Sequence, residues 1–210
     1  WTLSRGLGDV YKRQGIPYQR DGNNLWAKNK AFDSKKPTLL LNSHHDTVKP
    51  NAAYTNDPFE AKIEDGKLYG LGSNDAGGAL VSLIALFTHY FNKENPKYNL
   101  LVTASAEEEI AGDDSLSGLL PMLPKIDVAI VGEPTEMHLA VAEKGLIVFD
   151  AVITGTPGHA AHPNADNPIM KLPEVLNWFE NFKLQKYSDF LGDVKVTVTQ
   201  VRAGKEHNVV

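Results

Sequence analysis

The chain has 210 residues, and its hydrophobic content of 42% fits one medium-sized domain or one domain with part of a second. Its formal net charge is −5, with acidic and basic residues mixed along the chain, which excludes the basic stripe of a nucleic-acid-binding protein. We therefore expect a small molecule or a peptide as the partner. The absence of cysteine excludes disulfides and thiolate metal sites and is compatible with a reducing cytosol, so we expect a cytoplasmic protein.

The apolar runs, such as residues 39–41 and 79–87, are shorter than the ~20 residues that cross a bilayer, so no membrane partner is expected. The chain opens on Trp1 rather than on methionine, which leaves a signal peptide upstream as an open alternative. Residues 9–14, with the sequence DVYKRQ, resemble the translation of a transposon end used in preparing sequencing libraries. We therefore expect residues 1–14 to be a non-native segment, with an ordinary amphipathic terminus as the alternative.

Strands and helices alternate through the first two thirds of the chain. Three apolar runs predict buried strands, at residues 38–42, 99–105 and 127–131. Apolar residues at helical spacing predict one helix from near Gly77 to before Pro96 and another at residues 116–123. This alternation, with strands that lack a polar face, indicates an α/β fold with a mostly parallel sheet and helices on both faces. Active sites in such sheets lie at the carboxyl ends of the strands.

The pattern changes after Gly145. Residues 146–154 and 194–202 are longer runs of partly alternating polarity, which predict strands, and residues 169–182 between them have helical spacing. We expect residues 15–145 to form an incomplete first domain and residues 146–210 to form part of an inserted α+β domain. The remaining strands of that insertion are expected beyond Val210.

Histidine and acidic residues cluster after the predicted strands and in one glycine-rich turn. In the first cluster, residues two apart lean to the same face of an extended chain, so His44 can bind a metal ion while Asp46 accepts its other ring N–H. Taken alone, this pair is more often a surface coincidence. Asp75 lies among glycines before the long helix, and its two oxygens can bridge two cations. The alternative for Asp75 is a helix N-cap.

Two further acidic clusters follow the next two strands. In Glu107-Glu108-Glu109 the side chains alternate in direction, so one carboxylate can bind metal while its neighbour holds an attacking water and moves its proton. Pro134 restricts the turn that presents Glu133. A solvated acidic face and a helix start are the alternatives for these clusters. Together the clusters supply one imidazole and three carboxylates, which suit Zn²⁺ and would also accept Co²⁺ or Mn²⁺.

These motifs, with others along the chain, resemble the co-catalytic metallopeptidase family that includes acetylornithine deacetylase, succinyl-diaminopimelate desuccinylase, aminoacylase and carboxypeptidase G. The resemblance runs from about Gly15 to Val210. It rests on six motifs in the family's order: SHHDTV at 43–48, DPF at 57–59 with GKLYG at 66–70, ND at 74–75, EEE at 107–109, GEPT at 132–135 and GHAAHP at 158–163. It implies a catalytic domain with an inserted lid, two divalent cations, and a homodimer formed through the lid.

The resemblance also implies how the metal ligands divide. His44 and Glu133 would bind one metal ion, Asp75 would bridge the two ions, and Glu109 would bind the second. In the family the second ion's histidine follows the inserted domain, which would place it beyond Val210. We therefore expect this chain to bind one ion better than the other and to be inactive by itself.

The same resemblance assigns the reacting and substrate-binding groups. Glu108 would be the general base, and Asp46 would lie behind His44. His159 would be the histidine that the lid offers to the oxyanion across a dimer, with an ordinary surface turn as the alternative. Asn208 would contact the substrate.

The implied reaction is hydrolysis of the amide bond of an N-acyl amino acid. N-acetylornithine, a substrate of arginine biosynthesis, is the first choice because residues 132–135 and 155–163 most resemble those family members. N-succinyl-ornithine, N-succinyl-diaminopimelate and dipeptides stay open. A non-catalytic binding or oligomerisation module is the rival of another class. The retained cluster of like charges argues against it, since an idle site has no reason to keep one.

Overall fold

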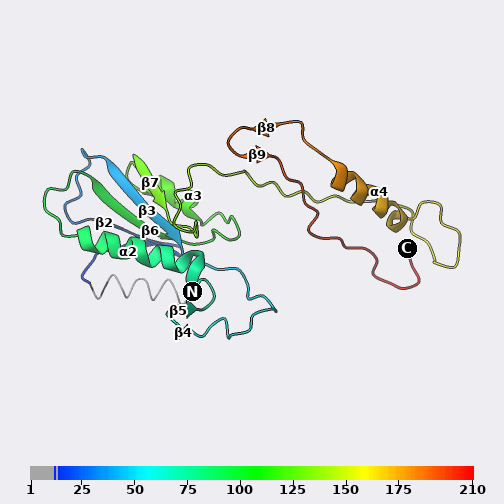
Figure 1. The fold of residues 1–210 in the computed structure, drawn as a ribbon, viewed down its shortest axis with the longest axis horizontal. Coiled ribbons are helices and arrows are strands. Elements are labelled where there is room, and N and C mark those ends of the chain that lie inside the picture. Colours follow the sequence, from blue (N-terminus) through cyan, green and yellow to red (C-terminus); the bar gives the residue numbers. More distant parts are fainter. Residues whose placement is uncertain (1–11, 13) are drawn as a thin grey trace. The chain divides into compact units, whose positions relative to one another are not determined.

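The structure is a computed structural model that describes residue 12 and residues 14–210 (Figure 1). The expected non-native segment, residues 1–14, therefore lies almost entirely outside the described residues. The chain divides into two compact units, one that ends at His138 and one that runs from Leu139 to Val210. The sequence places the change of pattern a few residues later, after Gly145.

A five-stranded sheet forms the centre of the first unit, in the order β1-β2-β6-β3-β7. Its strands are β1 (Gln19–Asp21), β2 (Asn24–Lys28), β3 (Thr38–His44), β6 (Asn99–Ser105) and β7 (Val128–Val131). Strand β3 pairs in parallel with β6 and β7, whereas β2 pairs antiparallel with β1 and β6. The predicted α/β class is confirmed, and the sheet is mixed because the β1–β2 hairpin is added to it in the antiparallel sense.

Helices cover both faces of this sheet, as predicted. On one face lies α2 (Ala79–Tyr90), which follows a short irregular helical segment, η1 (Ser73–Gly78) (Figure 1). On the other face Leu119, at the end of α3 (Leu116–Leu119), packs with the sheet just before η2 (Leu120–Met122). The adjacent residues Leu40 and Leu41 enter opposite cores, because side chains alternate along a strand.

Strand β7 departs from its prediction as a buried strand. The exposed fractions of Val128, Ile130 and Val131 are 61%, 46% and 54%. The reason is its position: among the described residues β7 pairs only with β3, so it forms an edge of the sheet. An apolar run predicts a strand but does not indicate whether another element covers it.

A short antiparallel hairpin, β4 (Lys62–Glu64) and β5 (Lys67–Tyr69), follows the loop after β3. Its turn is Asp65-Gly66, and both residues have positive φ angles, 50° and 73°. Asp-Gly is a preferred pair for such two-residue turns. The Asp65-Gly66 pair is therefore a sequence signal for this hairpin. Its three-residue strands are too short for hydrophobic periodicity to reveal them.

The second unit contains α4 (Pro168–Asn181), where helical spacing predicted it, and the two-residue strands β8 (Tyr187–Ser188) and β9 (Gly192–Asp193). The predicted strands at residues 146–154 and 194–202 were wrong, because these residues lie in no helix or strand. An extended segment becomes a strand only when a neighbour exchanges backbone hydrogen bonds with it. Neither α4 nor any other helix in the described part of the chain is long and apolar enough to span a membrane.

The packing of α2 on the sheet gives a first testable prediction. Phe87 is fully buried there, so Phe87→Ala should lower the free energy of unfolding by about 3–5 kcal/mol through the cavity that it leaves. Val81 lies on the same helix and is 63% exposed, so Val81→Ala should cost less than about 0.5 kcal/mol. Urea unfolding followed by circular dichroism compares the two variants. Equal losses would contradict the described packing of α2.

Candidate metal centre

His44 ends β3 at the carboxyl edge of the sheet and is 1% exposed. Its ring nitrogen Nδ1 lies 3.0 Å from the backbone carbonyl oxygen of Asp46, and a carbonyl oxygen can only accept a hydrogen bond. Nδ1 therefore carries a hydrogen, and in the neutral ring Nε2 has a lone pair. That lone pair faces Oδ1 of Asp75 at 3.0 Å. Two acceptors at this distance require a proton or a metal cation between them.

The surroundings of His44 act on its pKa in both directions. Burial by itself lowers the pKa, because it disfavours the charged ring. The hydrogen bond to Asp75 and the charges of Glu133 and Asp46 outweigh burial, so the pKa lies above its usual value of 6.5. Without metal, the proton takes the position that a cation would occupy.

The distances around His44 fit ligands that share one cation. Ligand atoms of a tetrahedral Zn²⁺ site, each ~2.0–2.2 Å from the metal, lie roughly 3.4 Å from one another. From Nε2 of His44, Oδ1 of Asp75 lies at 3.0 Å and Oε2 of Glu133 at 3.8 Å. Ligand atoms of His44, Asp75 and Glu109 all lie within 4.8 Å of one another. The structure thus brings all four residues that the sequence singled out as metal ligands to one edge of the sheet.

Backbone pairing beyond β7 places Glu133 in this group. The N–H of Gly132 donates to the carbonyl oxygen of Asn42 at 2.7 Å, which continues the β3–β7 ladder by one step. The hydroxyl of Ser43 donates to the carbonyl oxygen of Gly132 at 2.8 Å. Glu133 follows directly and is thereby held beside His44.

Asp75 is positioned by the irregular backbone of η1. Gly72 precedes η1 with a φ of 72°, and a Cβ there would overlap the methyl group of Thr47. A glycine is therefore required where this segment passes the chain that leaves β3. The Asp75–Ala76 peptide bond is cis.

The three consecutive glutamates after β6 have different surroundings. The carboxylate of Glu107 accepts a hydrogen bond from the backbone N–H of Asp114 at 3.1 Å, so this side chain stabilises the loop that carries it. Glu109 contributes its carboxylate to the ligand cluster. Glu108, between them, has its backbone N–H 3.3 Å from Oδ1 of Asp46.

Asp46 contacts more of the site than the sequence indicated. The carboxylate was expected to accept the ring N–H of His44, but the backbone carbonyl of Asp46 does so at 3.0 Å, and the nearer carboxylate oxygen is 3.5 Å away. The carboxylate instead accepts the backbone N–H groups of Glu108 and of Glu109, the latter at 3.1 Å. Asp46 therefore joins the end of β3 to the loop that carries both glutamates.

Asn24 is a second positioning residue, which no sequence motif indicated. It is 1% exposed at the start of β2. Its Oδ1 accepts the backbone N–H of Ala106 at 2.9 Å, and its Nδ2 donates to the carbonyl oxygen of Asp114 at 2.6 Å. These bonds hold both ends of the loop after β6. In the sequence Asp-Gly-Asn-Asn, no local feature distinguishes a buried asparagine side chain from one in an exposed turn.

The carboxylates in this cluster repel one another. Burial raises the pKa of Glu133, His44 lowers it, and the charges of Glu108, Asp75 and Glu109 raise it further. Among the ion pairs of the described residues, none joins these carboxylates to a lysine or arginine. An oxygen-rich group with one imidazole and excess negative charge fits a divalent cation such as Zn²⁺.

His159 and Asn208, the two candidate residues outside the cluster, lie together in the second unit. His159 forms an antiparallel bridge with Val209, flanked by a hydrogen bond from the N–H of Ala160 to the carbonyl oxygen of Asn208 at 2.9 Å. Segments about 50 residues apart in sequence are thus adjacent here, and they carry both residues that the sequence assigned to the substrate.

Comparison with known proteins identifies the family of the chain. Residues 40–207 match the family model described as Peptidase family M20/M25/M40. The chain belongs to this family. The matched range includes the four candidate ligands, Glu108 and His159.

Similar members of the M20 family are about twice as long as this chain. A succinyl-diaminopimelate desuccinylase of Buchnera aphidicola subsp. Acyrthosiphon pisum (strain Tuc7) is 32% identical over 97% of this chain and 56% of its own length. One of Rhodospirillum centenum is 29% identical over the same shares. A solved M20 family metallo-carboxypeptidase of Sulfolobus solfataricus is 23% identical, with a TM-score of 0.49 over 61% of this chain and 31% of its own.

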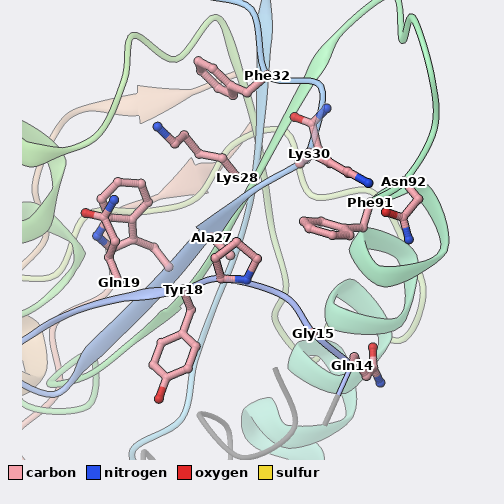
Figure 2. Close-up of a pocket in the computed structure, with 13 residues that line it drawn as sticks. Gln14, Gly15, Tyr18, Gln19, Ala27, Lys28, Lys30, Phe32, Phe91 and Asn92 are labelled. Carbon is pink, nitrogen blue, oxygen red and sulfur yellow. The ribbon is translucent and has the colours of Figure 1, made fainter. Parts of the chain in front are cut away.

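A cavity in the described part of the chain lies away from the metal cluster. It has a volume of about 560 Å³ and is lined by residues of β2, the end of α2 and the segment before β1, including Tyr18, Lys28 and Phe91 (Figure 2). Lys28 pairs with Leu101, toward the amino end of β6, whereas His44, Glu109 and Glu133 lie at or after the carboxyl ends of the parallel strands. None of the candidate ligands lines this cavity.

The raised pKa of His44 predicts opposite effects of pH on metal binding and on stability. The ring must lose its proton to bind Zn²⁺, so the affinity should fall by up to about tenfold per pH unit below that pKa. In the metal-free chain, the stabilisation from protonated His44 is fully present below its unfolded pKa of 6.5 and is lost as pH rises through the higher folded pKa.

Isothermal titration with Zn²⁺ and urea unfolding, between about pH 5.5 and 8.5, measure these two trends. His44→Gln should remove the high-affinity binding. His45→Gln is the matched control, because the ring of His45 contacts the carbonyl oxygen of Asn23 instead. Zn²⁺ affinity that does not change with pH, or that survives in His44→Gln, would refute the assignment of His44.

The contacts of Asp46 give a separate prediction. An amide at this position keeps one acceptor oxygen for two backbone N–H groups, so Asp46→Asn should loosen the loop that carries Glu109. We expect Zn²⁺ affinity to fall by about 10- to 100-fold. Asp113→Asn removes an exposed carboxylate from the same loop and should leave the affinity unchanged. Equal effects of the two substitutions would mean that net charge alone is responsible.

Proposed function

We propose that the complete protein of which this chain is part hydrolyses the amide bond of an N-acyl amino acid with two divalent cations, Zn²⁺ being the first choice and Co²⁺ or Mn²⁺ also acceptable. One observation carries the proposal: the buried ring of His44, held at Nδ1 by a carbonyl oxygen, directs the lone pair of Nε2 at carboxylate oxygens. That arrangement is unfavourable until a cation is present. The type of reaction is inferred from membership of the M20 family.

The division of the ligands between two ions is the one that the family resemblance implies. His44 and Glu133 would bind the first ion, and Asp75 would bridge the two. Glu109 would bind the second ion. Support comes from the separations of 3.0 and 3.8 Å around His44, which lie on either side of the value for ligands of one tetrahedral ion, roughly 3.4 Å.

Glu108 is the proposed general base. Bound divalent cations activate a water molecule and polarise the amide carbonyl. Glu108 accepts a proton from the attacking water and returns it to the leaving amine. Its neighbour Glu109 lies in the ligand cluster, and Asp46 holds the backbone N–H groups of both residues. His159, from the second unit, donates a hydrogen bond to the oxyanion, and Asn208 contacts the substrate.

The sequence motifs and the names of the similar proteins favour different acyl groups on the substrate. The motifs at residues 132–135 and 155–163 favoured N-acetylornithine, whereas the relatives named above are called succinyl-diaminopimelate desuccinylases. These relatives are 29–32% identical to the chain, and both substrates stay open. An N-succinyl amino acid is therefore the first compound to assay, with N-acetylornithine and dipeptides beside it.

The domain roles follow from the same proposal. Residues 15–145 form the amino-terminal part of the catalytic domain, and residues 146–210 form part of a lid through which two copies dimerise. The protein acts in the cytoplasm on a small molecule, without nucleic acid or membrane. A non-catalytic module with the same fold is the competing function, and it predicts no specific uptake of Zn²⁺ by this chain.

Substitution of Glu108 in the complete protein tests the reaction. Glu108→Gln removes the base without changing the size of the side chain, so it should retain metal and lower kcat by about 10²–10⁴-fold. Glu107→Gln is the matched control, since an amide oxygen can still accept the N–H of Asp114 and activity should persist. Hydrolysis assays after loading with Zn²⁺ or Co²⁺ compare them. Unchanged turnover in Glu108→Gln would exclude Glu108 as the base.

A further inference from the structure

The loop at residues 158–163 holds His159 through both its backbone and its ring. Gly158 and Val210 exchange two backbone hydrogen bonds, and the N–H of His162 donates to the carbonyl oxygen of His159 at 3.0 Å. The ring adds a third kind of contact: the backbone N–H of Ala161 donates to Nδ1 of His159 at 3.1 Å. The side chain is exposed, so burial does not restrict its ring.

The last contact determines which ring nitrogen carries the proton. A backbone N–H can only donate, so Nδ1 must be the acceptor and cannot carry a hydrogen. A neutral imidazole has one hydrogen, which must then lie on Nε2. Such a contact selects one tautomer of the histidine, as the partner of one ring nitrogen does at metal and catalytic sites. Here the selecting group is the main chain two residues ahead.

We propose that the backbone N–H of Ala161 holds neutral His159 as the Nε2–H tautomer, so that His159 presents a hydrogen-bond donor to an oxygen atom of the substrate. Ala161 is therefore a positioning residue that acts through His159. The inference rests on the proposed function for the identity of the oxygen, an amide carbonyl or carboxylate, but the tautomer depends only on this loop.

The tautomer decides between two roles for His159. With the hydrogen on Nε2, the neutral ring can donate to a carbonyl oxygen as negative charge develops on it. It cannot accept a proton at the same atom, and Nδ1 is already used by Ala161. The geometry thus makes His159 a donor and leaves proton abstraction to another residue, consistent with Glu108 as the base.

The hydrogen bond can be observed directly by NMR in the ¹⁵N-labelled 210-residue chain without metal. An N–H···N hydrogen bond transmits a scalar coupling between its two nitrogens, so a correlation between the amide nitrogen of Ala161 and Nδ1 of His159 is expected at a pH at which the ring is neutral. The spectrum of His159→Gln assigns the ring signals. Absence of the correlation in the folded chain would overturn the proposal.

The tautomer ratio provides a second, quantitative measurement. Relative to the urea-unfolded chain, the folded chain should favour Nε2–H by about 2- to 12-fold, the effect of one ordinary hydrogen bond. Ala161→Pro removes the donor and should return the ratio to the unfolded value. Ala161→Ser keeps the N–H and should keep both the ratio and the coupling. A folded-state ratio equal to the unfolded one, or shifted toward Nδ1–H, would also overturn the proposal.

These outcomes are separable from those of the proposed function. The coupling and the ratio are measured without substrate or metal, so they hold or fail regardless of Zn²⁺ uptake. If the tautomer is confirmed and the complete protein hydrolyses no N-acyl amino acid, the proposed function fails and the loop assignment stands. If hydrolysis is found and the coupling is absent, the loop assignment fails and the proposed function stands.

Discussion

The parallel alignment of β3 between β6 and β7 determines where three of the four candidate metal ligands of this protein lie. Parallel neighbours end at the same edge of a sheet. His44 ends β3, Glu109 follows β6, and Glu133 follows β7, so residues distant in sequence reach one small volume. Asp75 comes to the same edge from η1, the segment that leads into α2.

The same alignment creates an electrostatic problem that a cation resolves. Four carboxylates approach one buried imidazole, and the carbonyl oxygen of Asp46 orients that imidazole with a lone pair toward them. In the metal-free state a proton on His44 partly compensates, which is why its pKa is raised despite burial. Such a cluster of like charges is costly without a cation, as expected of a candidate binding site rather than a structural feature.

Hydrogen bonds to the backbone hold this arrangement in place. Asp46 and Asn24 reach the loop after β6 from two different strands, and each satisfies main-chain groups that a loop leaves unpaired. In the second unit Ala161 acts on His159 in the same way. The geometry of the reactive side chains therefore depends on residues that would not take part in the chemistry.

The sequence by itself determined the α/β class, the main strands and helices of the first unit, and the residue types that form the metal cluster, because hydrophobic periodicity and short motifs are local. It did not determine the lack of strand pairing at residues 146–154, the exposure of β7, the second role of Asp46 or the part played by Asn24. Each of these depends on which distant segment lies alongside, and only the tertiary structure decides that. A pattern along the chain specifies what a side chain can do, whereas its neighbours in space specify what it does.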